Sequence, residues 1–294
     1  MEIQTAIKIE NLIKKYKGFK LEIPSLKIPE GFATALIGEN GAGKSTLINV
    51  LAGIRLDYTG EITYFDGRQE EKAIRENVGY TGPGNYFMPY WTIDVVGKAS
   101  RLLFEQFHEE RYQEICQELG VDKKKTSIEK LSDGMKMKTM LAAVFARDTQ
   151  MLLLDEPASP LDPLMRDKLC SMIREYIEEG NGEKSVFFST HNIADMENVT
   201  DYAVIMAHGK IVEKGFVEDL KEKYILVKGE SSEADSGKEI LLGFQKNHYG
   251  YEGLCLSENL DKLAGMDIVT ETPTLSQISV AVMKEFSNLA GSAK

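Results

Sequence analysis

Residues 35–46 read ALIGENGAGKST, a short apolar run that ends in three glycines, a lysine and two hydroxyl side chains. The pattern G-x-x-x-x-G-K-[ST] is met by Gly38, Gly43, Lys44 and Ser45. Glycines allow backbone conformations closed to other residues, so successive N–H groups can converge on phosphate oxygens. The next stretch, TLINVLAGI, continues as a helix whose N-terminus also favours an anion. The stretch therefore predicts nucleotide binding, with Lys44 at the β/γ-phosphates and Ser45 on Mg²⁺. The alternative is a flexible strand-to-helix turn beside a surface lysine.

The length and the amino-acid composition are those of an ordinary globular protein. Its 294 residues suffice for one large domain or two smaller ones, and 43% are hydrophobic and 28% charged. A net charge of −11 argues against nucleic acid as the main partner. The three cysteines, at 116, 170 and 255, lack C-x-x-C spacing and suit a reducing compartment.

The chain shows no targeting signal. Its first residues, MEIQTAIKIENL, lack the basic-then-apolar pattern of a signal peptide, and no apolar stretch approaches the length of a membrane span. These patterns predict a soluble, cytoplasmic chain.

Apolar runs and helical patterns alternate along the chain. The runs ATALIG, EITYF, MLLLD, SVFFST and YAVIMA are rich in β-formers, and several are nearly continuous, as in buried parallel strands. Helical patterns between them predict an α/β core with helices on both faces of a mostly parallel sheet. Residues 85–147 lack strand signals and predict a helical insertion. In that segment one face of a helix carries Met137, Met140, Leu141, Val144 and Phe145, and the opposite face carries Lys136 and Lys138.

Beyond about Tyr224 the character of the chain changes. Residues 229–239, GESSEADSGKE, are polar and rich in small residues, which predicts a linker or exposed loop. Thr274 and Gln277 then match a capping box at the start of a helix. The apolar stripe of that helix, Leu275, Ile278 and Val282, is expected to form the core of a small appended unit, with a partner site as the alternative.

Two further strand ends carry polar side chains. MLLLDEP, residues 151–157, places Asp155 near the expected Mg²⁺ and aims Glu156 at a water that attacks the γ-phosphate. The alternative is a solvated acidic turn. SVFFSTHN ends at His191, whose neutral imidazole can hydrogen-bond the γ-phosphate or orient that water, although a lone histidine after a strand is often structural.

A second helix start also suits an anion. In LSDGM, residues 131–135, Ser132 and the backbone near Gly134 precede an amphipathic helix. One nucleotide does not need two phosphate-binding helix N-termini in the same chain. Both are useful if two chains pair head to tail and each offers its second site to the other's ATP. The alternative is an ordinary N-cap.

Together these motifs resemble the ATP-binding subunits of ABC transporters, over about residues 7–227. The resemblance implies an N-terminal antiparallel β subdomain beside the parallel core, a head-to-tail dimer and binding of ATP with Mg²⁺. It identifies GENGAGKST as Walker A, MLLLDE as Walker B, LSDGM as the signature and His191 as the switch histidine. Asp162 in the D-loop SPLDP would cross to the partner's nucleotide, and Tyr16 would stack on adenine, although an edge-strand tyrosine is the alternative. The nucleotide-binding residues so implied are Tyr16, Gly38, Asn40, Gly41, Ala42, Gly43, Lys44, Ser45, Thr46, Ser132, Gly134 and Asp162; Ser45 and Asp155 would hold the metal, and Glu156 and His191 would be catalytic.

The sequence departs from the family pattern in two places. Asp133 and Met135 replace the first glycine and the glutamine of the usual LSGGQ, a variant that resembles the ABC-2-type exporter branch for bacitracin-type antibiotics and phenol-soluble modulins. The Q-loop glutamine is replaced by Pro83, which has no side-chain ligand to offer, and Asn85 is a weak substitute.

An aromatic stretch follows the Q-loop position. NYFMPYW contains Tyr86, Phe87, Met88, Tyr90 and Trp91, residue types that are enriched at protein contacts. In the family this neighbourhood forms the groove for a helix of the membrane partner; ordinary packing between the insertion and the core is the alternative.

The resulting hypothesis is an ATPase that drives export through a separate transmembrane permease subunit, at the inner face of the cell membrane and without nucleic acid. Its second ATP-binding subunit is either an identical copy or a paralogue. We expect an ABC ATPase domain over residues 1–227 and a linker with a small accessory region over 228–294. The rivals are a soluble ABC ATPase that acts as a mechanical or regulatory factor, a small-molecule kinase, and a binding or sensing module.

Overall fold

The computed structural model describes residues 4–68, 74, 76–83, 87–121, 125–231 and 234–292. Its strands are β1 Thr5–Tyr16, β2 Phe19–Pro29, β3 Ala33–Ile37, β4 Thr59–Tyr64, β5 Val78–Thr81, β6 Met151–Leu154, β7 Ser185–Thr190, β8 Tyr202–Ala207, β9 Lys210–Phe216, β10 Tyr224–Glu230, β11 Leu242–Lys246, β12 Gly250–Leu256 and β13 Ile268–Glu271. Its helices are α1 Lys44–Leu51, α3 Ile93–Leu103, α4 Glu109–Glu118, α5 Asp133–Phe145, α6 Pro163–Glu179, α7 Val217–Lys223, α8 Ala234–Lys238 and α9 Leu275–Ser292.

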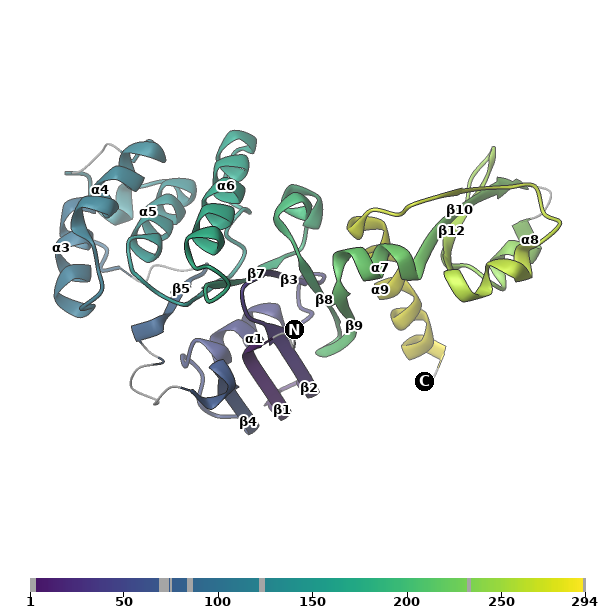
Figure 1. The fold of residues 1–294 in the computed structure, drawn as a ribbon, viewed down its shortest axis with the longest axis horizontal. Coiled ribbons are helices and arrows are strands. Elements are labelled where there is room, and N and C mark those ends of the chain that lie inside the picture. Colours follow the sequence, from purple (N-terminus) through teal and green to yellow (C-terminus); the bar gives the residue numbers. More distant parts are fainter. Residues whose placement is uncertain are drawn as a thin grey trace.

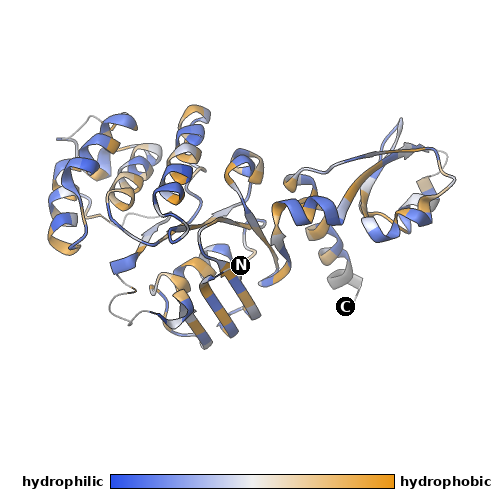
Figure 2. Cartoon of the chain, viewed as in Figure 1, coloured by the Kyte–Doolittle hydropathy of each residue, from blue (hydrophilic) through white to orange (hydrophobic). Residues whose placement is uncertain are grey.

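A six-stranded sheet forms the centre of the molecule (Figure 1), in the order β5-β6-β7-β3-β8-β9. Neighbouring strands are parallel except for the antiparallel pair β8–β9. Every residue of β3, β6 and β7 is buried, as expected for strands covered on both faces, and these strands are mostly apolar in Figure 2. The predicted α/β fold with a mostly parallel sheet is confirmed.

A three-stranded antiparallel sheet of order β2-β1-β4 lies against α1 and the central sheet. Its inward-facing residues share one hydrophobic cluster with α1 and the central strands, including Ile9, Leu12, Leu36, Leu47 and Phe187. Burial of this alternating face stabilises the sheet at about 25 cal/mol per Å² of apolar surface. The implied N-terminal antiparallel subdomain is confirmed.

The segment between β5 and β6 is helical, with α3, α4 and α5 beside one end of the central sheet (Figure 1). On α5 the predicted apolar face packs into the main core: Met137, Met140, Leu141 and Val144 are buried, and Phe145 is partly buried. The predicted helical insertion and its buried face are therefore confirmed.

The expected linker over residues 229–239 is wrong for the part that the structure describes. Gly229 and Glu230 end β10, paired with Tyr251 and Gly250 of β12, and Ala234–Lys238 is a short helix with Ala234 buried. The glycine fits close packing, because a Cβ on Gly229 would lie 2.4 Å from the ring of Tyr251. Small residues here make room for an aromatic ring and do not mark a flexible chain.

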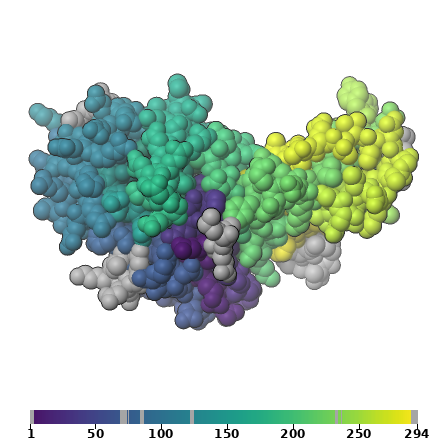
Figure 3. Space-filling view, in the orientation of Figure 1, coloured from purple at the N-terminus to yellow at the C-terminus, as the bar shows by residue number. Residues whose placement is uncertain are grey.

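The C-terminal residues build a four-stranded antiparallel sheet of order β11-β12-β10-β13, which the sequence patterns did not predict. It has its own small cluster of buried residues, which contains Val227, Tyr251 and Cys255. In Figure 3 the yellow residues of this region form a lobe beside the body of the molecule.

Helix α9 leaves this lobe and returns to the body. The predicted capping box is present: Gln277 N–H donates to Thr274 Oγ1 at 3.2 Å, and Thr274 N–H donates to Gln277 Oε1 at 2.8 Å. Leu275 and Ile278 are fully buried in the main core of the central sheet, so the stripe belongs to that core and not to the cluster inside the lobe. Among the described residues, no helix combines the length and the apolar character needed to cross a membrane.

Candidate functional site: a nucleotide pocket at the strand ends

The predicted motifs lie at the ends of three adjacent parallel strands. The glycine loop follows β3, Asp155 and Glu156 follow β6, and His191 follows β7, which lies between β6 and β3. Because the carboxyl ends of parallel strands meet at one edge of a sheet, the fold brings these segments together.

Lys44 sits inside the loop as the first residue of α1. The preceding Gly43 has φ +109°, a left-handed conformation that L side chains rarely adopt. Lys44 is only 5% exposed, and its Nζ donates to the carbonyl oxygens of Gly38 at 2.7 Å and Glu39 at 3.3 Å. A buried ammonium is thereby fixed where the loop would enclose phosphates.

Asp155 is fully buried at the end of β6. Its Oδ1 accepts a hydrogen bond of 2.5 Å from Ser189 Oγ. Burial raises the pKa of Asp155, and the nearby hydroxyls of Ser189 and Ser45 offset part of that rise. Ser189 was missed by the sequence reasoning. The available signal was a hydroxyl inside an apolar parallel strand, two residues before His191.

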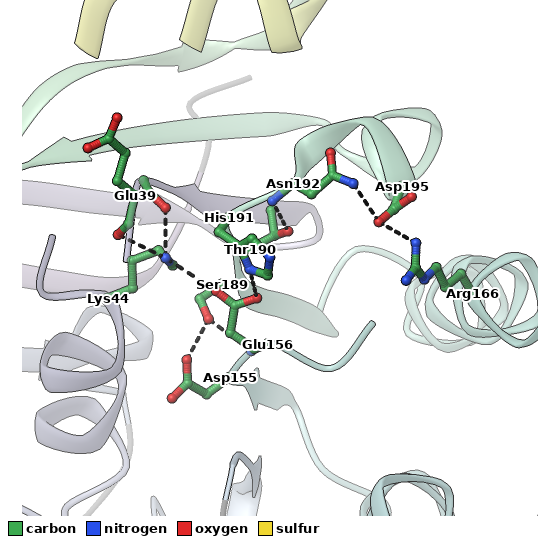
Figure 4. A network of polar contacts seen from close by, with 11 residues as sticks. Glu39, Lys44, Asp155, Glu156, Arg166, Ser189, Thr190, His191, Asn192 and Asp195 are labelled. Atoms are coloured by element: carbon green, nitrogen blue, oxygen red, sulfur yellow. Dashed lines mark hydrogen bonds and ion pairs between the residues drawn. The ribbon is translucent and has the colours of Figure 1, made fainter. Parts of the chain in front are cut away.

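Glu156 lies between two predicted site residues (Figure 4). Its Oε1 is 3.2 Å from Lys44 Nζ, and its Oε2 is 2.7 Å from His191 Nδ1. The Glu156 side chain is 17% exposed and that of His191 is 44% exposed. The three groups thus form one chain of charge and hydrogen bonding that opens to solvent at the imidazole.

The backbone of Glu156 is strained. Its φ of +50° is uncommon for a residue with a side chain and costs on the order of 1 kcal/mol or more. The Glu156 N–H donates to Ser189 Oγ at 2.9 Å, so Ser189 fixes this turn as well as Asp155. Such strain is common where a side chain is aimed at a reaction centre.

The surroundings of Asp155 fit a divalent cation. Its Oδ2 is buried and has no hydrogen-bond partner among the described residues, an expensive arrangement for a carboxylate oxygen. The Ser45 hydroxyl is close enough to lower the pKa of this carboxyl. A carboxylate beside a hydroxyl at the phosphate loop is the donor set expected for Mg²⁺ with a nucleotide.

A second polar network ties β7 to α6. Asp195 Oδ2 accepts from Asn192 Nδ2 at 2.8 Å and from Arg166 Nη1 at 2.7 Å (Figure 4). Arg166 Nε also donates to the carbonyl of Leu161 at 2.9 Å. The turn that carries His191 is therefore connected to the SPLDP loop.

Tyr16 lies at the β1–β2 hairpin beside the phosphate loop. Its ring is 43% exposed and lies 6.4 Å from the ring of Phe19, and a Cβ on Gly43 would meet Phe19 at 2.8 Å. Lys14 Nζ lies 4.8 Å from the centre of the Tyr16 ring. An exposed ring here is available to stack on a base.

Ser132, Gly134 and Asp162 make local contacts. Ser132 Oγ caps α5 by accepting from Met135 N–H at 3.3 Å, and Asp162 caps α6 by accepting from Met165 N–H at 3.1 Å. Gly134 packs against the carbonyl of Pro160. Ser132 and Asp162 are exposed, so both N-cap side chains are accessible from solvent.

A cavity of about 540 Å³ lies between the strand ends and the start of α5. Its lining includes Asn40, Pro83, Lys136, Glu156, Pro160 and His191. Pro83 thus borders the site even though it offers no side-chain ligand. Lys136, which was predicted to lie on the polar face of α5, also lines this cavity, and its Nζ pairs with Asp133 Oδ1 at 3.2 Å. Asn85 lies outside the described residues.

The aromatic stretch is divided between core and surface. Phe87 and Trp91 pack partly buried against the main core and line a groove of about 350 Å³ with Leu103. Met88 is 51% and Tyr90 71% exposed. Tyr86 lies outside the described residues.

Comparisons with known proteins agree with this arrangement. A family model described as "ABC transporter" matches residues 21–159. The uncharacterized ABC transporter ATP-binding protein YxlF of Bacillus subtilis is 33% identical over 222 residues, which cover 74% of this chain and 73% of that protein. Human ATP-binding cassette sub-family A member 10 is 32% identical over 74% of this chain, which spans only 15% of the length of that relative.

The fold matches solved structures of the same kind. A dimeric ATP-binding cassette in a post-hydrolysis state, bound to ADP and Pi, superposes with a TM-score of 0.60 at 19% identity, over 71% of this chain and 98% of that one. The chain belongs to the family of ABC transporter ATP-binding proteins.

Proposed function

We propose that the chain is the energy-coupling ATPase of an ABC-2-type exporter, and that it hydrolyses ATP as a head-to-tail dimer. The observation that carries the chemistry is the position of Glu156, whose carboxylate contacts both Lys44 and His191. In this role residues 1–227 form the ATPase domain and residues 228–294 an accessory region. The chain lies at the inner face of the cell membrane, bound to a separate permease.

In this proposal the nucleotide competes with Glu156 for Lys44. ATP draws the ammonium to the β/γ-phosphates, which frees the Glu156 carboxylate to accept a proton from the attacking water. Tyr16 stacks on the base, and the phosphate loop, residues 38–46, donates its N–H groups to the phosphates. Ser45 and Asp155 hold Mg²⁺, which neutralises phosphate charge when bound.

His191 orients the water. Because Glu156 accepts the hydrogen bond, Nδ1 of the imidazole carries the proton, and a neutral ring then has a lone pair on Nε2. That nitrogen accepts from water and sets the direction of attack. Positioning of this kind supplies most of the catalysis in phosphoryl transfer.

The exposed caps support the dimer. Each ATP would lie between Lys44 and Ser45 of one chain and Ser132 and Gly134 of the other, with Asp162 crossing the interface. The N-caps Ser132 and Asp162 of two helices are exposed to solvent, and the sequence contains one phosphate-loop motif. The second cassette is a copy of this chain or a paralogue, and an identical copy is directly testable.

Complementation tests the composite site. Ser132→Asp keeps a good N-cap but opposes the partner's γ-phosphate with a negative charge, and Lys44→Ala disables the loop. Each variant alone should be inactive. An equimolar mixture should regain about a quarter of wild-type ATPase activity, because half of the pairs are mixed in a symmetric dimer and each has one intact site. Phosphate release from the mixture measures this; a mixture as inactive as its components contradicts the pairing.

The groove beside Trp91 is proposed to receive a helix of the permease. Tyr90→Ala removes an exposed ring without opening the core. It should reduce co-purification with the membrane subunit several-fold, because truncating an aromatic side chain that contributes to a contact costs about 1 kcal/mol or more, about fivefold in affinity. ATPase activity of the isolated chain should stay unchanged. Leu164→Ala, at a side chain that is also exposed but lies on α6, is the matched control. Equal recovery of the permease with both variants contradicts the groove assignment.

A further inference from the structure

Helix α9 borders the phosphate loop at a small cavity. Met283 and Ser287 of α9 line a cavity of about 80 Å³ together with Glu39, Asn40 and His208. Met283 and Ser287 are four residues apart and so lie on the same face of the helix. The accessory region therefore meets the nucleotide site through α9.

Helix α9 makes a polar and an aromatic contact with the turn between β8 and β9. His208, between β8 and β9, has its Nε2 3.2 Å from Ser287 Oγ. Its ring also stacks on Phe286, with centroids 6.2 Å apart and an angle of 29°. One histidine thus receives both a polar and an aromatic contact from adjacent residues of α9.

The same turn holds the phosphate loop. The N–H of Gly209 donates to the carbonyl of Ala42 at 2.9 Å, one residue before Gly43. The carbonyl of Gly209 accepts from Glu22 N–H at 2.8 Å, so the turn is fixed to β2 as well. His208 has φ +48°, a conformation that its surroundings must maintain. A shift of His208 would therefore move the hydrogen bond to Ala42.

The other end of α9 is firmly anchored. Leu275 and Ile278 are fully buried, Leu275 N–H donates to Glu197 Oε1 at 2.9 Å, and α9 packs on β11 of the accessory sheet. The helix is thus held by the lobe and the core at its start and touches the loop-supporting turn near its end.

We propose that α9 is a positioning element for ATP binding, in which Phe286 and Ser287 fix His208 and thereby the backbone of the phosphate loop at Ala42. The inference rests on the proposed binding of ATP at that loop. None of these residues touches the reacting atoms, so they act through the loop. Reciprocity then requires that ATP binding stabilise α9, because a coupling between two sites acts equally in both directions.

Steady-state kinetics of the full chain test this. Phe286→Ala should raise the KM for ATP about fivefold or more while kcat changes less than about twofold, and Phe286→Tyr should restore KM because it keeps the ring. Ser287→Ala, at an exposed position, should give a smaller rise without disturbing the fold. Lys284→Ala, on an exposed part of the same helix, is the matched control and should leave KM unchanged.

Hydrogen exchange tests the reciprocal effect. Amides of residues 279–288 should exchange more slowly with MgATP in the wild type, and this protection should shrink in Phe286→Ala. An unchanged KM in Phe286→Ala and Ser287→Ala, or α9 exchange that does not respond to ATP, overturns the inference. If the wild type itself binds no ATP, the proposed function fails instead.

Discussion

Replacing Glu156 by glutamine should reduce ATP hydrolysis by about 10²–10⁴-fold, the usual contribution of a positioned general base. The amide keeps the size of the side chain and still accepts a hydrogen bond from His191, but it does not take up the proton of the attacking water. ATP binding should survive and even tighten, because the variant removes the carboxylate that pairs with Lys44 at 3.2 Å. We therefore expect a lower Kd for ATP and accumulation of the closed dimer.

Single-turnover hydrolysis, equilibrium ATP binding and size-exclusion chromatography with MgATP measure these effects. Glu178→Gln is a suitable control, because this exposed glutamate on α6 lies outside the site. A Glu156→Gln protein that hydrolyses ATP at the native rate would remove Glu156 from its assigned role.

Replacing Asp155 by asparagine should have opposite effects on activity and stability. Loss of the carboxylate removes a proposed Mg²⁺ ligand, and hydrolysis should fall by at least about 100-fold. The nucleotide-free protein should become more stable at neutral pH, because a fully buried carboxylate is replaced by a neutral amide whose oxygen can still accept from Ser189. A gain of 1 kcal/mol corresponds to about 2 °C in Tm for a protein of this size.

The pH dependence follows from the raised pKa of Asp155. Because the folded-state pKa lies above the unfolded value, the folded chain holds the proton more tightly, and this contribution to stability is lost as the pH rises through the folded pKa. The stability difference between Asp155→Asn and wild type should therefore be largest at neutral pH and vanish below about pH 4. Thermal melts across this range without nucleotide measure it. Asp148→Asn, at an exposed carboxylate, should show no such gain; an equal gain there would contradict the burial argument.

The position of the candidate site at one edge of the sheet was predictable from the sequence. Apolar runs before Gly38, Asp155 and His191 predict three buried strands, and adjacent parallel strands bring their ends together. The order in which β6, β7 and β3 lie side by side is a long-range property, but the motifs limit the possible arrangements.

Ser189 was not predictable in its role. A hydroxyl in an apolar strand is common, and its two hydrogen bonds depend on the turn of Glu156, whose positive φ no local pattern indicates. The contact between Glu156 and Lys44 likewise requires the packed sheet.

The C-terminal sheet was not predicted, because it too depends on contacts between residues that are distant in the sequence. Gly229 and Gly237 suggest a flexible segment when only their neighbours in sequence are considered. In the structure both pack against the ring of Tyr251, more than ten residues away. A local pattern cannot distinguish a glycine that frees the backbone from one that admits a distant ring.

The return of α9 to the body has a consequence for synthesis on the ribosome. Leu275 and Ile278 fill the main core beside strands that left the exit tunnel some 70 residues earlier. Until α9 emerges, that part of the core stays open and the nascent chain exposes apolar surface. Such surface binds chaperones and makes the chain prone to aggregation. Premature termination after His191 but before Leu275 would thus leave a cassette with all of its nucleotide motifs and an unfinished interior.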